Sequence, residues 1–135
     1  MTMPDIPAGS TIIGVGIDLI EVSRIVRALE RQADRFRKRV FTDEEIEYCD
    51  GMKFSGPHFA ARFAAKEAVS KAFGTGIGEH FGWKSAGVLR NQLGKPTICL
   101  DESGRALLAK KEASDVLISL AHTREHATAI ALLIR

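Results

Sequence analysis

The apolar residues of this chain recur with two different periods, which predict a mixture of helices and strands. Between residues 22 and 40 they recur at steps of three and four, which is the pattern of an amphipathic helix of about five turns. Its apolar positions are Val22, Ile25, Val26, Leu29, Ala33, Phe36 and Val40. A continuous apolar run at residues 11–17 instead predicts a buried strand, with Asp18 at its exit.

Local start and stop signals predict two further helices. Thr42 followed three residues later by Glu45 is typical of a capping box, and it predicts a short acidic helix after residue 42. Pro57 suits the first turn of a longer helix, which continues to about residue 73 and is ended by Gly74.

Most of the predicted strands lie in the C-terminal half of the chain. Strands are expected at residues 83–90, 95–100, 116–121 and 127–134, with a helix at residues 103–112. The order β, α, α, α, β, β, α, β, β indicates an α+β fold. We therefore expect a small single domain whose mainly antiparallel sheet packs on a long helix.

Length and composition limit the class of protein. The chain has 135 residues, the length of one domain, and no stretch approaches the roughly 20 apolar residues that cross a bilayer. Residues 1–10 are expected to form a flexible leader and residues 11–135 the domain. Because the N-terminus lacks a secretory signal, we expect a cytoplasmic protein.

Cys49 and Cys99 lack C-x-x-C spacing and are predicted to be buried free thiols.

Charge is concentrated on one face of the helix predicted at residues 22–40. The net charge is only +2, yet five basic residues fall within an arc of roughly 80° opposite the apolar face. They are Arg24, Arg27, Arg31, Arg35 and Lys38. Such a face can be a solvated surface, but a row of arginines also suits the recognition of carboxylates or phosphates.

Two carboxylates suggest metal chemistry. Asp18 at a strand end and Glu67 on the long helix would supply oxygen ligands from rigid elements, and Lys71 lies one turn after Glu67. Mg²⁺ takes one or two carboxylates and completes its shell with water and substrate phosphates. Glu67 and Lys71 could equally form an ordinary surface pair.

Other familiar signatures are weak or missing. The glycines at residues 74–78 follow their helix, whereas a phosphate-binding loop precedes one, so Gly74 is interpreted as a C-cap. His122 and His126 are predicted at strand ends, which does not match the helical pair of a zinc site. No arrangement typical of a serine or cysteine nucleophile is found, so any chemistry is expected to be metal-assisted.

Several motifs occur together in one order: residues 14–18 (GVGID), 41–45 (FTDEE), 62–68 (RFAAKEA), 71–76 (KAFGTG), 94–96 (GKP) and 119–123 (SLAHT). In this combination the chain resembles the holo-[acyl-carrier-protein] synthase family of small phosphopantetheinyl transferases. The resemblance covers about residues 12–135. The chain departs from the family pattern at Ala121, where the family commonly has a second hydroxyl residue immediately before the histidine.

The resemblance implies roles for individual residues. It implies Mg²⁺ ligation by Asp18 and Glu67, with Lys71 near the reacting phosphates. Contacts with coenzyme A are implied for Arg62, Lys71, Gly74, His122 and Thr123. Arg24 falls on an arginine that docks an acidic helix of the carrier protein, and Arg27, Arg31 and Arg35 follow it on that surface. A homotrimer with active sites at subunit interfaces is also implied.

The resulting hypothesis is a Mg²⁺-dependent transferase of fatty acid biosynthesis. It would move 4′-phosphopantetheine from coenzyme A to a serine of apo acyl carrier protein and release 3′,5′-adenosine bisphosphate. Glu67, directly or through a water, would accept the serine proton. We expect neither nucleic acid nor membrane as a partner. The alternatives are a nucleic-acid-binding module using the basic helix, which lacks an aromatic stacking platform, and a metal-dependent phosphohydrolase, for which few acids are present.

Overall fold

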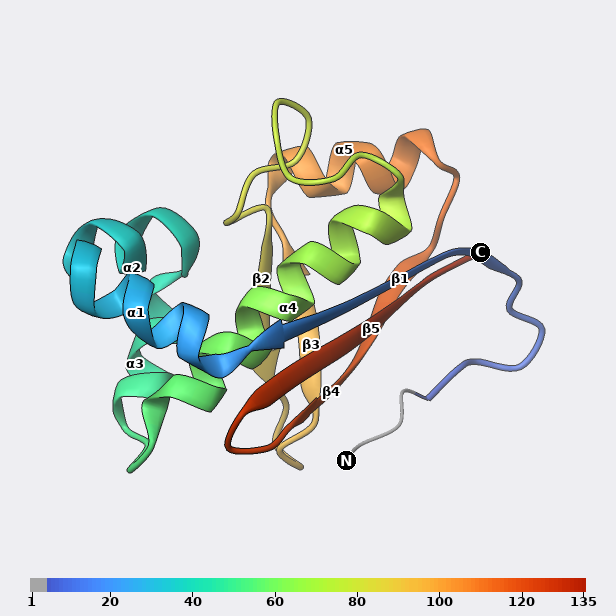
Figure 1. Cartoon of the computed structure of the whole chain (residues 1–135). Helices are drawn as coiled ribbons and strands as arrows, with labels where there is room; N and C mark the ends of the chain where they lie inside the picture. Colours follow the sequence, from blue (N-terminus) through green and yellow to red (C-terminus); the bar gives the residue numbers. More distant parts are fainter. Residues whose placement is uncertain (1–4) are drawn as a thin grey trace.

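The computed structural model describes residues 5–135 (Figure 1). One long central helix, α4, lies between a three-stranded sheet and a β-hairpin, with the shorter helices gathered at its ends. The elements are β1 (Ile12–Glu21), α1 (Val22–Gln32), α2 (Asp34–Val40), α3 (Asp43–Asp50), α4 (Ser55–Phe73), β2 (Ala86–Arg90), β3 (Pro96–Leu100), α5 (Glu102–Lys110), β4 (Asp115–His122) and β5 (His126–Ile134).

Both sheets are antiparallel, which confirms the predicted α+β class. The first sheet has the strand order β1-β5-β4, and the second is the hairpin of β2 and β3. In the first sheet Asp18 lies opposite Ala129 and His122 lies opposite Ala127. The register therefore places Asp18 and His122 on the two strands that flank β5.

Small residues let α4 approach the sheet closely. A Cβ atom on Gly16 would lie 1.8 Å from the carbonyl oxygen of Ala68, so β1 and α4 meet backbone to backbone. The facing side of α4 is rich in buried alanines. Because strand side chains alternate between the two faces, Gly16 and Asp18 face α4, whereas Val15, Ile17 and Leu19 face outward.

The capping box of α3 is confirmed and has a second role. Thr42 Oγ1 accepts from the backbone of Glu45, and Glu45 Oε1 accepts from the backbone of Thr42 at 2.8 Å. The same carboxylate accepts from Val88 N at 2.9 Å and pairs with Lys66 Nζ at 2.7 Å. Glu45 and Lys66 are fully buried, so this ion pair ties α3, α4 and β2 together.

The single helix predicted at residues 22–40 is wrong. The chain breaks at Ala33, which has a φ of +46°, and α2 begins at Asp34. The apolar spacing continues across the break because Phe36 and Val40 still reach the core, where Phe36 packs against Phe41 and Phe63. Periodicity therefore could not reveal the change of direction.

Two further predictions need correction. Strand β1 continues to Glu21, so Asp18 lies within the strand rather than at its exit, because Ile20 still packs in the core and Leu19 still pairs with Thr128. Cys49 is buried as predicted, but Cys99 is exposed because β3 turns its side chain to solvent; both thiols are free.

Only residues 5–10 of the predicted leader fall within the described part of the chain, and residues 1–4 lie outside it. In the remainder, the exposed Asp5 carboxylate pairs with Lys95 Nζ at 2.8 Å. Within the described part of the chain, no helix has the length and apolar character needed to span a membrane.

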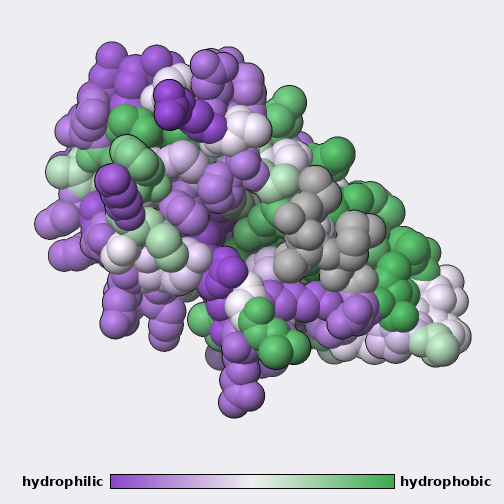
Figure 2. Space-filling model, turned by 90° about the horizontal axis from the view of Figure 1, so that it is seen from below, coloured by the Kyte–Doolittle hydropathy of each residue, from purple (hydrophilic) through white to green (hydrophobic). Residues whose placement is uncertain are grey.

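The outer face of the three-stranded sheet is apolar. Val15, Ile17 and Leu19 are 55%, 63% and 69% exposed. Figure 2 shows hydrophobic side chains gathered over the part of the molecule that holds the strands, whereas the part with α1 to α3 is mostly hydrophilic. This face has no covering element among the described residues.

Candidate active site

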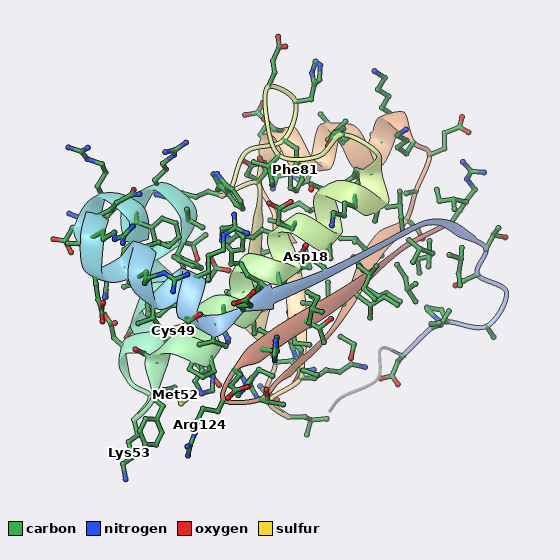
Figure 3. The ribbon with its side chains drawn as sticks, viewed as in Figure 1. Asp18, Cys49, Met52, Lys53, Phe81 and Arg124 are labelled. Atoms are coloured by element: carbon green, nitrogen blue, oxygen red, sulfur yellow. The ribbon has the colours of Figure 1, made fainter. Side chains whose placement is uncertain are left out.

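Asp18, Glu67 and Lys71 meet where β1 crosses α4, and Figure 3 shows Asp18 at this crossing. Lys71 Nζ donates to Asp18 Oδ1 at 3.1 Å and to the carbonyl oxygen of Ile17 at 3.0 Å. Lys71 is therefore held towards β1, although its side chain remains about half exposed. The alternative of an ordinary surface pair between Glu67 and Lys71 is therefore not observed, because Lys71 pairs with Asp18 instead.

The electrostatics of Glu67 show how close the two carboxylates are. Burial raises the pKa of Glu67 above its ordinary value of 4.5, and the neighbouring Asp18 carboxylate raises the pKa further. The cations of Lys71 and Arg24 act in the opposite direction. Within residues 5–135, Glu67 forms no ion pair of its own, so its carboxylate remains available to a cation.

The donor set at this crossing fits Mg²⁺. Asp18 and Glu67 supply two carboxylates from rigid elements, and Mg²⁺ is commonly held by one or two carboxylates together with waters and substrate phosphates. No group of three or more histidine, cysteine or acidic side chains suited to a metal occurs in the described residues. An all-protein cage, such as a structural zinc site needs, is therefore not offered there.

The arginines occupy two helices rather than one. Arg24, Arg27 and Arg31 lie on α1, and Arg35 lies on α2 beyond the break; all four are exposed. Arg24 is close enough to influence the pKa of Glu67. The basic surface therefore begins beside the carboxylates, but the continuous stripe calculated for one helix stops at Ala33.

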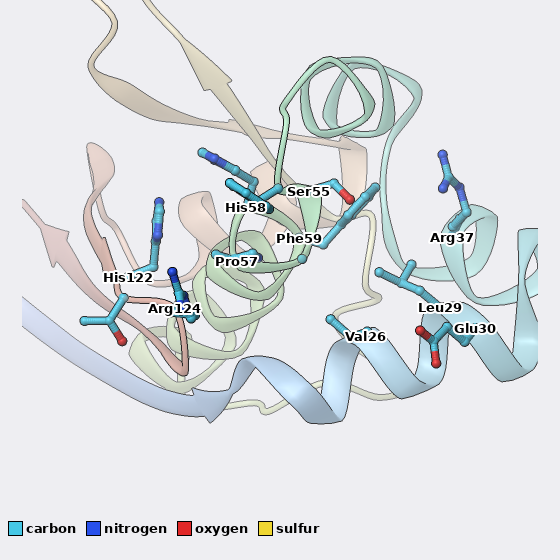
Figure 4. Close-up of a pocket in the computed structure, with 13 residues that line it drawn as sticks. Val26, Leu29, Glu30, Arg37, Ser55, Pro57, His58, Phe59, His122 and Arg124 are labelled. Carbon is cyan, nitrogen blue, oxygen red and sulfur yellow. The ribbon is translucent and has the colours of Figure 1, made fainter.

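A second group of candidate residues lies at the other end of α4. A cavity of about 950 Å³ opens between α1, the start of α4 and the β4–β5 turn (Figure 4). His122, Thr123 and Arg124 come to it from the β4–β5 end, and His58 comes from α4. The Thr123 hydroxyl accepts from the backbone of His126 at 3.1 Å, which shapes the turn.

Arg62 is buried near this cavity rather than at the carboxylates. Its guanidinium stands 4.2 Å from the centre of the Tyr48 ring, and Nη1 donates to the carbonyl oxygen of His58 at 3.3 Å. Within residues 5–135 its Nε has no hydrogen-bond partner. A buried guanidinium with an unused donor is well suited to an anion.

Gly74 ends α4 as predicted. It adopts a φ of +80°, in the left-handed region that favours glycine, and its N–H donates to the carbonyl oxygen of Lys71 at 3.0 Å. A Cβ atom on Gly74 would meet nothing within 4 Å. The glycine is required by the turn, and open space remains beside it.

Comparison with known proteins identifies the family. Residues 14–131 match the model of the 4′-phosphopantetheinyl transferase superfamily. The chain belongs to this superfamily. The family membership that the motifs indicated is thereby confirmed.

Curated relatives agree with this assignment. A holo-[acyl-carrier-protein] synthase of Ruminiclostridium cellulolyticum is 44% identical over 121 residues, covering 88% of this chain and 90% of the relative. One from Chlamydia trachomatis serovar D is 44% identical over 119 residues, covering 88% and 97%.

Solved structures also agree. The synthase of Neisseria meningitidis superimposes with a TM-score of 0.84 at 29% identity, covering 91% of this chain and 98% of that one. The synthase of Bacillus anthracis, solved in complex with CoA (3′,5′-ADP), has a TM-score of 0.75 at 36% identity, covering 91% and 96%.

In this phosphopantetheinyl transferase fold, the candidate residues of one chain form two separate groups. Asp18, Glu67, Lys71 and Arg24 lie together, whereas His122 and Thr123 line the cavity and Arg62 lies next to it, donating to the carbonyl oxygen of His58. His58 precedes Glu67 by nine residues, which corresponds to about 13 Å along the helix axis. The sequence predicts that these residues form one site at a subunit interface, and a single chain does not bring them together.

Sequence reasoning missed three residues that line the cavity: Arg37, His58 and Arg124. Arg37 pairs with Asp50 and stands over the Phe59 ring. None of the three belongs to a spaced motif, and only the packing of the helices against the β4–β5 turn brings them together. The sole available signal was the local density of basic residues.

Proposed function

We propose that this chain transfers 4′-phosphopantetheine from coenzyme A to a serine hydroxyl of an apo acyl carrier protein and releases 3′,5′-adenosine bisphosphate. The observation that carries the proposal is the meeting of Asp18, Glu67 and Lys71 at the crossing of β1 and α4 in a chain of this superfamily. The Bacillus anthracis synthase in complex with CoA (3′,5′-ADP) supports the choice of coenzyme. The proposed location is the cytoplasm.

Asp18 and Glu67 would hold Mg²⁺, which on binding supplies positive charge to offset the charge of the phosphates during transfer. Lys71 is placed to donate to the same phosphates, because its ammonium already lies at the Asp18 carboxylate. Such preorganised donors stabilise charge that develops in the transition state. Gly74 leaves open space beside this end of the helix for the coenzyme.

Glu67 is the proposed base for the serine hydroxyl. Its carboxylate has no ion-pair partner within residues 5–135, and it would accept the proton directly or through a water. Its position beside the phosphate-binding lysine would also hold the hydroxyl near the phosphorus atom that it attacks.

The exposed arginines of α1 and α2 would receive the carrier protein. Arg24 stands beside the carboxylate pair, and Arg27, Arg31 and Arg35 extend the basic surface away from it. Bidentate pairing of guanidinium groups with carboxylates suits an acidic helix as partner. The docked serine would then lie next to Glu67.

A homotrimer would unite the two groups of site residues. The exposed apolar face of β1 provides a surface of the kind that is buried in stable oligomers. If subunits pack through this face, the Asp18 group of one chain can lie beside the cavity of the next. This arrangement would explain why the cavity that His122 lines lies apart from Glu67 within one chain.

The decisive experiment is mass spectrometry of apo acyl carrier protein after incubation with this protein, coenzyme A and Mg²⁺. We expect the carrier to gain the mass of one phosphopantetheine, and chelation of the metal to abolish the gain. Glu67→Ala should lower the rate of transfer at least about 100-fold, because it deletes a metal ligand and the base. Glu79→Ala, a change of an exposed acid in the loop after α4, serves as control.

No adduct with the unchanged protein would refute the proposed activity. Transfer at the normal rate by Glu67→Ala would refute only the metal and base assignments, provided that circular dichroism shows the same fold for both proteins.

A further inference from the structure

Two histidines meet in the wall of the large cavity. His58, near the start of α4, is partly buried, and its ring centre lies 4.8 Å from that of His122 on β4 in an edge-to-face arrangement. The His58 ring also lies 5.9 Å from the Tyr48 ring of α3. Both histidines line the cavity, and Figure 4 shows them beside Arg124.

The groups around His58 are mainly cationic. His122 faces it from β4, Tyr48 from α3, Arg62 from α4 and Arg90 from β2. Across the same cavity stand Arg37 of α2, Arg124 of the β4–β5 turn and one acid, Glu30 of α1. This lining suits a ligand that carries negative charge.

Burial lowers the pKa of His58 below its ordinary value of 6.5, and the charges of His122, Arg62 and Arg90 lower the pKa further. His58 is therefore neutral in the free protein at neutral pH. A phosphate dianion in the cavity beside the two imidazoles would reverse the electrostatic balance, because an opposite charge within about 4–6 Å favours the protonated form.

We propose that His58, together with His122, binds a phosphate group of the coenzyme and takes up a proton from solvent as that phosphate binds. The proposal rests on the proposed function, which identifies the ligand as coenzyme A. No bond is made or broken in this step; one proton moves from the buffer to the imidazole of His58. The protonated ring then donates a charge-assisted hydrogen bond to a phosphate oxygen.

The sign of the pH dependence follows. Since binding raises the pKa of His58, its imidazole holds more protons in the complex than in the free protein, and the contribution of His58 to affinity rises as the pH falls through this window. The gain is complete below both pKa values and amounts to about tenfold for each unit of rise in pKa. At pH 8 and above, the neutral ring contributes little.

The test is titration calorimetry with 3′,5′-adenosine bisphosphate as the probe, between pH 5.5 and 8.5. At each pH, two buffers of different ionisation enthalpy report the protons taken up on binding. We expect His58→Phe to weaken binding about tenfold at pH 6 and much less at pH 8, with reduced proton uptake. His58→Gln, which cannot become charged, should behave in the same way.

His80→Phe is the matched control, because His80 is an exposed histidine of the loop after α4 and does not line the cavity. It should keep the affinity and proton uptake of the unchanged protein. The His58 proposal is overturned if His58→Phe and His58→Gln also keep both. If the unchanged protein transfers phosphopantetheine normally in that case, only the role of His58 falls; if it binds neither the probe nor coenzyme A, the proposed function falls with it.

Discussion

The two cysteines show how strongly burial changes the chemistry of one side chain. Cys49 lies in the core, where burial raises the pKa of its thiol from 9.0 to about 12, whereas Cys99 is exposed on β3. The thiolate is the form that reacts with alkylating reagents. The two thiols of one chain should therefore react at very different rates.

We expect iodoacetamide at pH 8 to alkylate only Cys99 in the folded protein and both cysteines in urea, as counted by mass spectrometry. Two rapid adducts on the folded chain would contradict the buried position of Cys49. Because the unfolded state loses the Cys49 proton near pH 9 while the folded state keeps it to about pH 12, this thiol should also lower stability as the pH rises above about 9.

Between elements, the approach of β1 to α4 is limited by glycine. The Cβ of an alanine at position 16 would fall 1.8 Å from the Ala68 carbonyl oxygen, a distance that only a shift of backbone could relieve. The same crossing carries Asp18 and Glu67. Packing and the candidate metal site therefore depend on one contact.

Gly16→Ala should cost at least about 3 kcal/mol of stability, at the upper end for overpacked cores. Chemical denaturation followed by circular dichroism measures the loss. Gly78→Ala is the control, since a Cβ there meets nothing within 4 Å, and it should change stability by less than about 0.5 kcal/mol. Equal stability of the two variants would show that β1 can move away from α4 at little cost.

At the scale of the whole molecule, the outer face of the three-stranded sheet stands out. Its β1 residues Val15, Ile17 and Leu19 are each more than half exposed. Neighbouring positions of β5, Ile130 and Leu132, share this face in the strand register. A continuous apolar surface of this kind is typical of an interface between subunits.

We expect Ile17→Lys to convert the proposed trimer into monomers, because a charge placed in an apolar interface loses its hydration. Light scattering after gel filtration gives the mass, and circular dichroism should show an unchanged fold. Phosphopantetheine transfer should fall with the trimer, since the proposed site is shared between subunits. Leu93→Lys, at the 93% exposed tip of the β2–β3 hairpin, should leave both unchanged.

A trimer that survives Ile17→Lys would exclude this face as the interface. A monomer that keeps full activity would instead show that one chain contains the complete site.

Several local features of this protein could be predicted from the order of its residues alone. The capping box at Thr42, the glycine that ends α4 and the alternation of the final strands depend on residues close in the chain, so their physics is readable without a fold. Local sequence also placed Asp18 on a strand and Glu67 on a long helix, although it could not show that the two elements cross. The family motifs added their roles as predictions.

The tertiary structure decided what depends on distant contacts. The break at Ala33 keeps the apolar spacing intact, so no periodicity could reveal it. The buried Glu45–Lys66 pair and the meeting of His58 with His122 join segments far apart in sequence. Such contacts arise only when helices and strands pack into one core, because the energy of a buried charge or ring is set by its neighbours in space.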